Sequence, residues 1–352
     1  MPIDPQRIHD AQMLLARHFG PTGIARAASL SSPGHGVFLK LETDLPTGSF
    51  KVRGAIYSLS VNLARGTVRE VVCASTGNHG AAVAYAAQLL NVPATIFLPV
   101  GPNPVKAARI RALGARIVES GIDLSAAIDA AQDYAERAPA LFLHDASDPD
   151  VPVGTATIGV EIVDQLPDVD VIYVPMGDTA LIRGVASAAK QRRPSIIIVG
   201  VVAEQAPAYL LSWRRAGTRG SRLRAPRASA GQAGLGADGF GTGARDSGLG
   251  AHDDVVETAT CDTIADGLAI RRPLAPNVAA IRDLVDDVVA VSEQEMIAAI
   301  ELLDGREQVI AEPAGAAATA ALLKRPTAAR TSVVLVTGSN IAPGLRPTPR
   351  AK

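Results

Sequence analysis

The chain has little of several features that mark particular classes of protein. Only two of its 352 residues are cysteine, Cys73 and Cys261, and their wide separation gives neither a metal-ligand spacing nor a disulfide framework. Aromatic residues make up 3% and the net charge is −1, so neither stacking platforms nor a basic surface for nucleic acid is expected. No apolar run is long enough to span a bilayer, and the N-terminus lacks the basic-then-apolar order of a signal peptide. We therefore predict a soluble, cytoplasmic protein.

What the chain does have is a large apolar fraction, 47%, arranged in alternating strand-like and helix-like runs. Strands are predicted at 69–75, 94–99, 115–120, 169–175, 195–202 and 331–338, and helices at 79–90, 103–114, 124–137 and 181–191. Short apolar strands that alternate with amphipathic helices are typical of parallel sheets covered on both faces. The predicted fold class is therefore α/β, with three layers, α/β/α.

One stretch breaks this alternation. Residues 216–252 are rich in Gly, Ala, Arg and Ser and have no hydrophobic period. Such a composition is typical of a flexible surface insertion, which is the interpretation we favour, with a functional lid as the alternative.

Three glycine-containing turns follow predicted strands, where open α/β sheets place their ligands. The first is "ASTGNHG" at 74–80, the second "PMGDTALIRG" at 175–184 and the third "VTGSN" at 336–340. Backbone N–H groups at the start of a helix suit a carboxylate or a phosphate. Each turn alone is a weak signal, because a glycine after a strand is more often simply a turn.

Lys51 adds a candidate for covalent chemistry. It lies in "TGSFKVRGA" (47–55), among small and turn-forming residues just before a predicted helix. A lysine becomes a nucleophile only when neutral, and burial or a neighbouring cation favours that state. A reactive lysine, an anion-binding turn and a carboxylate-binding turn together point to pyridoxal phosphate bound as a Schiff base.

The chain resembles a known family, the fold-type II pyridoxal-phosphate enzymes of the threonine/serine dehydratase and serine racemase group. The resemblance rests on "KLETDLPTGSFKVRGA" (40–55), "STGNHGAAVAYAA" (75–87), "TIADGLAI" (263–270), "LVDDVVAVSEQEM" (284–296) and "EPAGAAATAALL" (312–323). It runs from about residue 5 to 345. It implies two tryptophan synthase β-like domains with the cofactor between them. Residues 1–69 and 149–352 would form the large cofactor-binding domain, and residues 70–148 the small mobile one.

The resemblance also implies a role for each matching residue. Lys51 would carry the cofactor and move protons at Cα, and Thr76 would be the hydroxyl on the opposite face. The substrate carboxylate would be bound by Ser75, Thr76, Gly77, Asn78 and His79. The cofactor would be contacted by Phe50, Asn78, Gly177, Asp178, Thr179, Ala180, Leu181, Gly267, Glu312 and Thr337. Thr337 would face the pyridine nitrogen as a weak neutral partner, which suits β-elimination.

Several residues depart from the family pattern. The phosphate loop is Gly177, Asp178, Thr179 and Ala180 instead of four glycines. Because a carboxylate repels phosphate, we expect the Asp178 side chain to turn away and cap the following helix. Thr76 stands where racemases of this group have serine, which disfavours racemisation. Val202 and Ala208 stand where metal-binding members have acidic residues, so no metal site of the family type is expected. Thr155, Ala156 and Ala146 alter the substrate side of the pocket.

These observations predict a pyridoxal-phosphate-dependent ammonia-lyase that removes water from a 3-hydroxy amino acid such as threonine or serine. Bulkier substrates stay open, among them 3-hydroxyaspartate, phenylserine and a hydroxyectoine-derived amino acid. Amino-acid racemisation and β-replacement are alternatives, the latter disfavoured by the dehydratase-like "SFKVRGA". The alternative from another class is a non-catalytic phosphate- or amino-acid-binding protein, suggested by the altered glycine loop. The family also implies a homodimer that acts on a small amino-acid substrate. The composition predicts neither a nucleic-acid partner nor a membrane.

Overall fold

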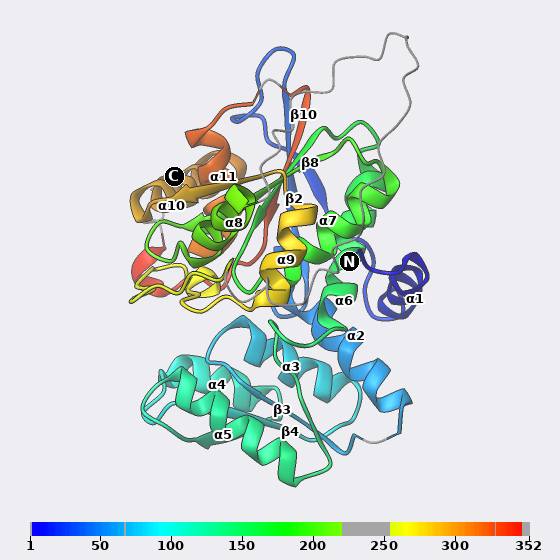
Figure 1. Ribbon diagram of the computed structural model, residues 1–352, viewed down its shortest axis with the longest axis vertical. Helices are drawn as coiled ribbons and strands as arrows, with labels where there is room; N and C mark the ends of the chain where they lie inside the picture. The colour runs from blue at the N-terminus through cyan, green and yellow to red at the C-terminus, as the bar shows by residue number, and fades with distance from the viewer. Residues whose placement is uncertain (1, 67, 220–253, 328, 347–352) are drawn as a thin grey trace, which may run out of the picture.

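The computed structural model describes residues 2–66, 68–219, 254–327 and 329–346. The described residues form two parallel-rich sheets with helices on their faces (Figure 1). The helices are α1 (Pro5–Leu15), α2 (Lys51–Ala64), α3 (Asn78–Leu89), α4 (Pro104–Ala112), α5 (Leu124–Arg137), α6 (Val151–Gln165), α7 (Ala180–Arg192), α8 (Ala208–Arg219), α9 (Ala275–Leu284), α10 (Glu293–Leu302) and α11 (Pro313–Lys324). Short helical turns lie at η1 (Glu42–Asp44), η3 (Asp266–Leu268), η4 (Leu303–Glu307) and η5 (Pro343–Leu345).

The larger sheet has, among the described residues, six strands in the order β1-β2-β10-β7-β8-β9. These are β1 (Ile24–Arg26), β2 (Gly36–Leu41), β7 (Val171–Pro175), β8 (Ile197–Ala203), β9 (Asp287–Val291) and β10 (Thr331–Val336). Only the β1–β2 pair is antiparallel in this part of the chain. The smaller sheet has four described strands in the order β5-β4-β3-β6, all parallel. Its strands are β3 (Glu70–Ala74), β4 (Ala94–Leu98), β5 (Arg116–Glu119) and β6 (Ala140–Phe142).

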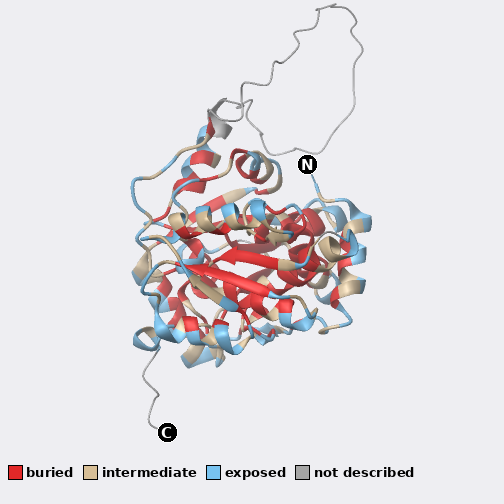
Figure 2. Cartoon of the chain, turned by 90° about the horizontal axis from the view of Figure 1, so that it is seen from below, coloured by how far each residue is buried: buried red, intermediate tan, exposed pale blue. Residues whose placement is uncertain are grey.

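Alternate side chains of β7 enter two different hydrophobic clusters, one on each face of the larger sheet. Val171 and Tyr173 pack in the cluster that contains α10 and α11, whereas Ile172 and Val174 pack in the cluster that contains α7 and α9. Both faces are therefore covered, which explains why the strand is apolar at every position. Figure 2 shows the same arrangement, with buried strands in the interior and helices whose outer faces are exposed.

The sequence predictions for the strands and helices between 69 and 203 agree with the structure to within a few residues. Gly114 adopts φ +80° directly after α4, as a helix-terminating glycine should. β5 differs from the expectation of fully buried strands, because it is an edge strand with exposed Arg116 and Glu119. The predicted insertion, 216–252, begins too early, because α8 continues to Arg219 although Gly217 and Thr218 are weak helix formers. The rest of that stretch lies outside the described residues.

No helix in the described ranges is both long and apolar enough to cross a membrane.

The carboxyl ends of strands from both sheets meet at one place in the fold. β3 leads into the 75–77 turn, β6 into residues 143–150, β7 into residues 176–179 and β10 into residues 337–341. In Figure 1 the smaller sheet, with α3, α4 and α5, lies below the larger sheet, and α2 and α6 lie between them. Loops at the ends of these strands are where an open α/β fold places ligands.

Candidate active site

Lys51 is the first residue of α2, and the backbone before it is attached to the end of β10. Ser49 forms an isolated bridge with Gly338, and the Phe50 N–H donates to the Thr337 carbonyl at 3.1 Å. Gly48, just upstream, has φ +62°, and a Cβ there would lie 2.9 Å from the Ser339 hydroxyl. The close approach and the left-handed turn explain this glycine. Lys51 is thereby fixed where the central strand of the larger sheet ends.

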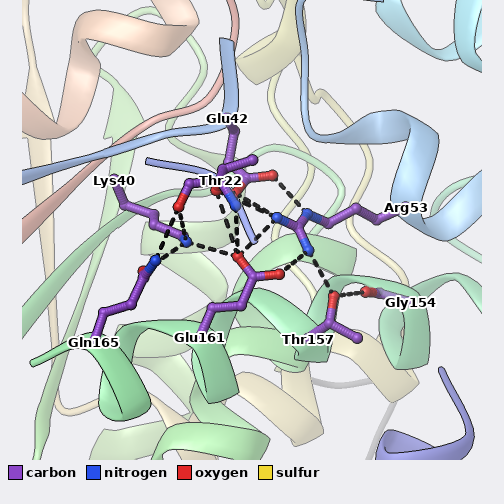
Figure 3. A network of polar contacts seen from close by, with 8 residues as sticks. All are labelled: Thr22, Lys40, Glu42, Arg53, Gly154, Thr157, Glu161 and Gln165. Carbon is purple, nitrogen blue, oxygen red and sulfur yellow. Dashed lines mark hydrogen bonds and ion pairs between the residues drawn. The ribbon is translucent and has the colours of Figure 1, made fainter. Parts of the chain in front are cut away.

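A buried ionic network holds α2 in this position (Figure 3). Arg53, two residues after Lys51, donates to Glu42 at 2.7 Å and to Glu161 at 2.5 Å. Lys40 donates to Glu161 at 2.6 Å. Burial lowers the pKa of Lys40 despite the carboxylate of Glu161. Because β2, α2 and α6 each contribute charged side chains, the network ties the start of α2 to both neighbours.

The Lys51 ammonium lies between two carboxylates. It forms an ion pair with Asp145 and a second one with Asp178, at 2.9 Å from Oδ2. Burial opposes the charge on Lys51, but the two carboxylates outweigh burial and raise its pKa. The Phe50 ring centroid lies 5.3 Å from Nζ, so the predicted neighbour of the cofactor is beside the lysine.

Asp145 is a site residue that the sequence did not reveal. It lies between β6 and α6, in "HDASDPD", where no spacing rule marks one of three aspartates as special. One of its oxygens accepts from Lys51 and the other accepts from His79 Nδ1 at 2.6 Å. Although burial would raise the pKa of Asp145, His79 and Lys51 hold it well below its usual range.

The turn between β3 and α3 contains the residues predicted to bind the substrate carboxylate. Ser75 Oγ accepts from the Gly77 N–H at 3.2 Å, and a Cβ added at Gly77 would meet no described heavy atom within 4 Å. Thr76 makes no side-chain hydrogen bond within the described part of the chain. Open space beside Gly77 and a free hydroxyl at Thr76 leave this turn available to a ligand.

Asn78 and His79 begin α3 and are both engaged. Asn78 Nδ2 donates to Glu312 Oε1 at 2.6 Å, and its Oδ1 accepts from Asn340 at 2.6 Å. His79 Nε2 donates to the Leu143 carbonyl at 2.9 Å, while Nδ1 contacts Asp145. Both ring nitrogens therefore face acceptors, which favours the doubly protonated imidazolium.

The predicted phosphate loop precedes α7. A Cβ at Gly177 would lie 2.1 Å from the Gly267 carbonyl oxygen, so only glycine fits there. Thr179 has φ +76° and is 1% exposed, and its hydroxyl has no hydrogen-bond partner among the described residues. Ala180 and Leu181 open α7 and are both buried. An unpartnered buried hydroxyl at a helix N-terminus is suited to an anion.

The Asp178 carboxylate caps the start of α7, as expected, but it lies on one of the N–H groups expected to hold the phosphate instead of turning away from them. Its Oδ1 accepts from the Ala180 N–H at 2.9 Å, and its Oδ2 pairs with Lys51. The contact with Lys51 was not expected, because the sequence places the two residues 127 positions apart.

Three further predicted residues line the same edge. Gly267 lies in η3, where a Cβ would come within 3.2 Å of the Ala314 Cβ. Glu312 precedes α11, and burial raises its pKa to about 7 against the opposing hydrogen bond from Asn78. Thr337 ends β10, is 3% exposed and directs its hydroxyl toward the Ala314 carbonyl at 3.5 Å.

The two positions that bear on the metal prediction are structural. Val202 is buried in β8 and Ala208 begins α8. Within the described ranges, no group of three or more His, Cys, Asp or Glu side chains is arranged to hold a metal ion.

Lys51 at the start of a helix, the unpartnered Thr179 hydroxyl before α7 and the open turn at Gly77 meet at the junction of two parallel sheets. Such an arrangement is typical of the class of fold-type II pyridoxal-phosphate enzymes. The comparison with protein families agrees. The chain belongs to the family described as "Pyridoxal-phosphate dependent enzyme", whose model matches residues 15–338.

Individual relatives cover nearly the whole chain. An L-threonine ammonia-lyase of Thermotoga maritima is 34% identical over 96% of this chain and 76% of its own length. The catabolic L-threonine dehydratase of Escherichia coli K12 is 31% identical over 97% of this chain and 94% of its own length. Among solved structures, maize serine racemase superimposes with a TM-score of 0.81 at 27% identity, covering 98% of this chain and 95% of that one.

Proposed function

We propose that this protein is a pyridoxal-phosphate-dependent ammonia-lyase that eliminates water from a 3-hydroxy amino acid such as threonine or serine, giving a 2-oxo acid and ammonia. The observation that carries the proposal is the placement of Lys51. Its ammonium group pairs with Asp178, which lies at the start of α7, and with Asp145, which also pairs with His79 in the 75–79 turn. The names of the relatives, L-threonine ammonia-lyase and L-threonine dehydratase, support the same reaction.

The residues fit the cofactor. The unpartnered Thr179 hydroxyl and the first N–H groups of α7 would hold the phosphate, and Gly267 would leave room beside the ring. Asn78 and Glu312 would lie at the ring edge, with Thr337 at the pyridine nitrogen. When bound through Lys51, pyridoxal phosphate withdraws electrons from the substrate and makes the Cα proton acidic.

The protein's own groups then carry the remaining tasks. Ser75, Thr76, Gly77 and His79 belong to the turn that would bind the substrate carboxylate, through N–H groups at the start of α3. Lys51, displaced by the substrate amine, takes the Cα proton. A neutral hydroxyl at Thr337 would leave the ring nitrogen of the bound cofactor largely unprotonated, so the cofactor would supply only moderate stabilisation of negative charge at Cα. Moderate stabilisation suits elimination, in which the hydroxyl leaves soon after the proton.

Release of 2-oxo acid from a panel of substrates tests this function. The panel contains the D and L forms of serine, threonine, 3-hydroxyaspartate and phenylserine, together with the hydroxyectoine-derived amino acid. We expect release from one or two members. We expect 3-hydroxyaspartate to be a poor substrate, because its second carboxylate would approach Asp145 and Asp178. Silence across the panel with the cofactor bound would contradict the proposal.

Racemisation is a second candidate, favoured by the likeness to maize serine racemase and by the free hydroxyl of Thr76. A hydroxyl on the face opposite Lys51 can return a proton to Cα. Thr76→Ala should therefore abolish any racemisation and leave elimination within a few-fold, and Thr76→Ser should raise racemisation. Chiral chromatography of the remaining substrate measures both, and undiminished racemisation in Thr76→Ala would exclude Thr76 as the acid.

We further propose that residues 70–148 move as a small domain against residues 1–69 and 149–352. The division is supported by the smaller sheet, whose strands β3 to β6 all lie within residues 70–148. Such a motion would break two contacts. Arg109 donates to the Thr47 carbonyl at 2.5 Å, and Lys106 pairs with Asp266 at 2.6 Å on the surface. Homodimerisation and a cytoplasmic location stay predictions.

A further inference from the structure

Asp145 is the only side chain in the described part of the chain that joins Lys51 directly to a second cation. One carboxylate oxygen accepts from Lys51 Nζ and the other accepts from His79 Nδ1 at 2.6 Å. The side chains of Lys51 and Asp145 are each 13% exposed, so water screens this pair only weakly. The Asp145 carboxylate therefore contacts Lys51 Nζ, the nitrogen that takes the Cα proton in the proposed function.

His79 keeps Asp145 ionised and in place. Its Nε2 donates to the Leu143 carbonyl at 2.9 Å, so Nδ1 can face a carboxylate only as a second donor. Burial disfavours the charged ring, but Asp145 outweighs burial and raises the pKa of His79. A neutral Lys51 would favour the imidazolium further, because the Lys51 charge is one of the groups that lowers the pKa of His79.

The other charged groups around Lys51 come from three elements. Asp178, before α7, pairs with Nζ at 2.9 Å, and Arg183, one turn into α7, lies near Asp178. His144 lies beside Asp145 in the chain, and burial, together with the charge of His79, lowers its pKa. Two cations and two carboxylates therefore lie together here. Lys51 contacts both Asp145 and Asp178, and His79 contacts Asp145.

We propose that Asp145 is a catalytic residue that strengthens Lys51 as a base and then holds the proton that Lys51 has taken, with His79 as its positioning residue. This proposal rests on the proposed function and goes beyond it. A Cα proton is only weakly acidic, so a base whose conjugate acid is stabilised by a contacting carboxylate removes it more readily.

The Cα–H bond breaks and its proton forms a new N–H bond at Nζ, giving an ammonium that Asp145 stabilises. The electron pair left at Cα becomes the Cα–Cβ double bond. The Cβ–O bond breaks, and its own bonding pair leaves with the hydroxyl oxygen. The leaving hydroxyl takes the proton from Nζ and departs as water, which restores the neutral amine.

The first test reads Lys51 without any turnover. The cofactor-free protein is labelled with an amine-acylating reagent across pH 7 to 11, and mass spectrometry follows the Lys51 peptide. The exposed Lys106 serves as the internal reference. Asp145→Asn keeps the shape and removes the charge. Asp148→Asn is the matched control, because Asp148 lies in the same loop but accepts from Ser58 and from the backbone of Asp150 and Val151.

We expect Lys51 to label more slowly than Lys106 in the unaltered protein. We expect the Lys51 rate at pH 9 to rise about tenfold or more in Asp145→Asn, because each pKa unit changes the neutral fraction tenfold. Asp148→Asn should leave it unchanged. An equal rise in both variants, or none in Asp145→Asn, would overturn the proposal. If Asp145→Asn does not fold, the unaltered protein still tests the proposal. The proposal is overturned if its pH profile of labelling gives Lys51 a pKa no higher than that of Lys106.

The second test uses turnover. With a substrate from the panel deuterated at Cα, Asp145→Asn should lower kcat at least tenfold, enlarge the deuterium isotope effect and leave KM within a few-fold. Asp145→Glu should recover part of kcat. An unchanged isotope effect with lowered kcat would contradict a role in proton removal. Failure of the proposed function is distinguishable, because it would silence every variant and leave the labelling result intact.

Discussion

Asn78 at the start of α3 and Glu312 at the start of α11 are joined by a hydrogen bond of 2.6 Å, in which Asn78 Nδ2 donates to Glu312 Oε1. The two residues are 234 positions apart and belong to helices that cover different sheets. The bond therefore connects the two halves of the candidate site. Because burial raises the pKa of the Glu312 carboxyl group here, the free energy of unfolding should depend on its protonation.

Glu312→Gln should stabilise the protein at pH 8 but change its stability little at pH 5. Burial raises the pKa of Glu312 from 4.5 to about 7, so its folded state binds a proton more tightly than its unfolded state. The associated stability is fully present below about pH 4.5 and is lost as the pH rises through 7. Glutamine keeps the acceptor for Asn78 and carries no charge. Thermal unfolding of the cofactor-free protein at both pH values measures the difference, and an identical pH dependence for the two proteins would refute the assignment.

Asp178→Gly should tighten the binding of pyridoxal phosphate. The Asp178 carboxylate takes the Ala180 N–H, which is one of the groups expected to hold the phosphate, and adds a negative charge beside it. A unit charge about 4 Å away costs about 4 kcal/mol at an effective dielectric constant of about 20, so even a strongly screened effect should lower Kd about tenfold. Absorbance titration with the cofactor measures Kd. Asp178→Asn separates charge from shape, and weaker binding in both variants would show that Asp178 assists the cofactor.

Much of the site could be predicted from the sequence, because its motifs lie in single short segments. The 75–79 turn and the 177–181 loop each follow a strand whose apolar pattern is clear, and parallel strands bring their carboxyl ends to one edge. Lys51 was marked by its motif, "TGSFKVRGA", rather than by a strand before it. Capping by Asp178 follows from local rules as well, since its partner is two residues away.

Residues whose role depends on long-range contacts were not predictable. Asp145 is one aspartate among several in its loop, and only the folded structure brings it to Lys51, 94 positions away. Arg53 and the Glu161 with which it pairs are 108 positions apart, and nothing in the local pattern of α6 marks Glu161 as half-buried and paired. Among the described strands, β1 and β6 were not predicted, because they have three residues each and give no measurable period. β2 and β9 were not predicted either, although they have six and five residues.

Glu161→Gln should destabilise the fold by about 3–5 kcal/mol, because it leaves the buried Lys40 and Arg53 short of one carboxylate. The side chains of Lys40 and Arg53 are 0% and 1% exposed, so water cannot replace the lost partner. Glu204→Gln is the control, since its ion pair with Lys324 is on the surface and should cost less than about 1 kcal/mol. Urea unfolding at pH 7 measures both variants. Equal losses would mean that the network does not fix α2.

The most direct test of the account is the identity of the residue that carries the cofactor. The protein is saturated with pyridoxal phosphate, reduced with borohydride, digested and analysed by mass spectrometry. We predict a phosphopyridoxyl group on the peptide that contains Lys51, and its absence after Lys51→Ala together with loss of the cofactor's absorption band. Modification of another lysine, with Lys51 left free, would contradict the account at its centre.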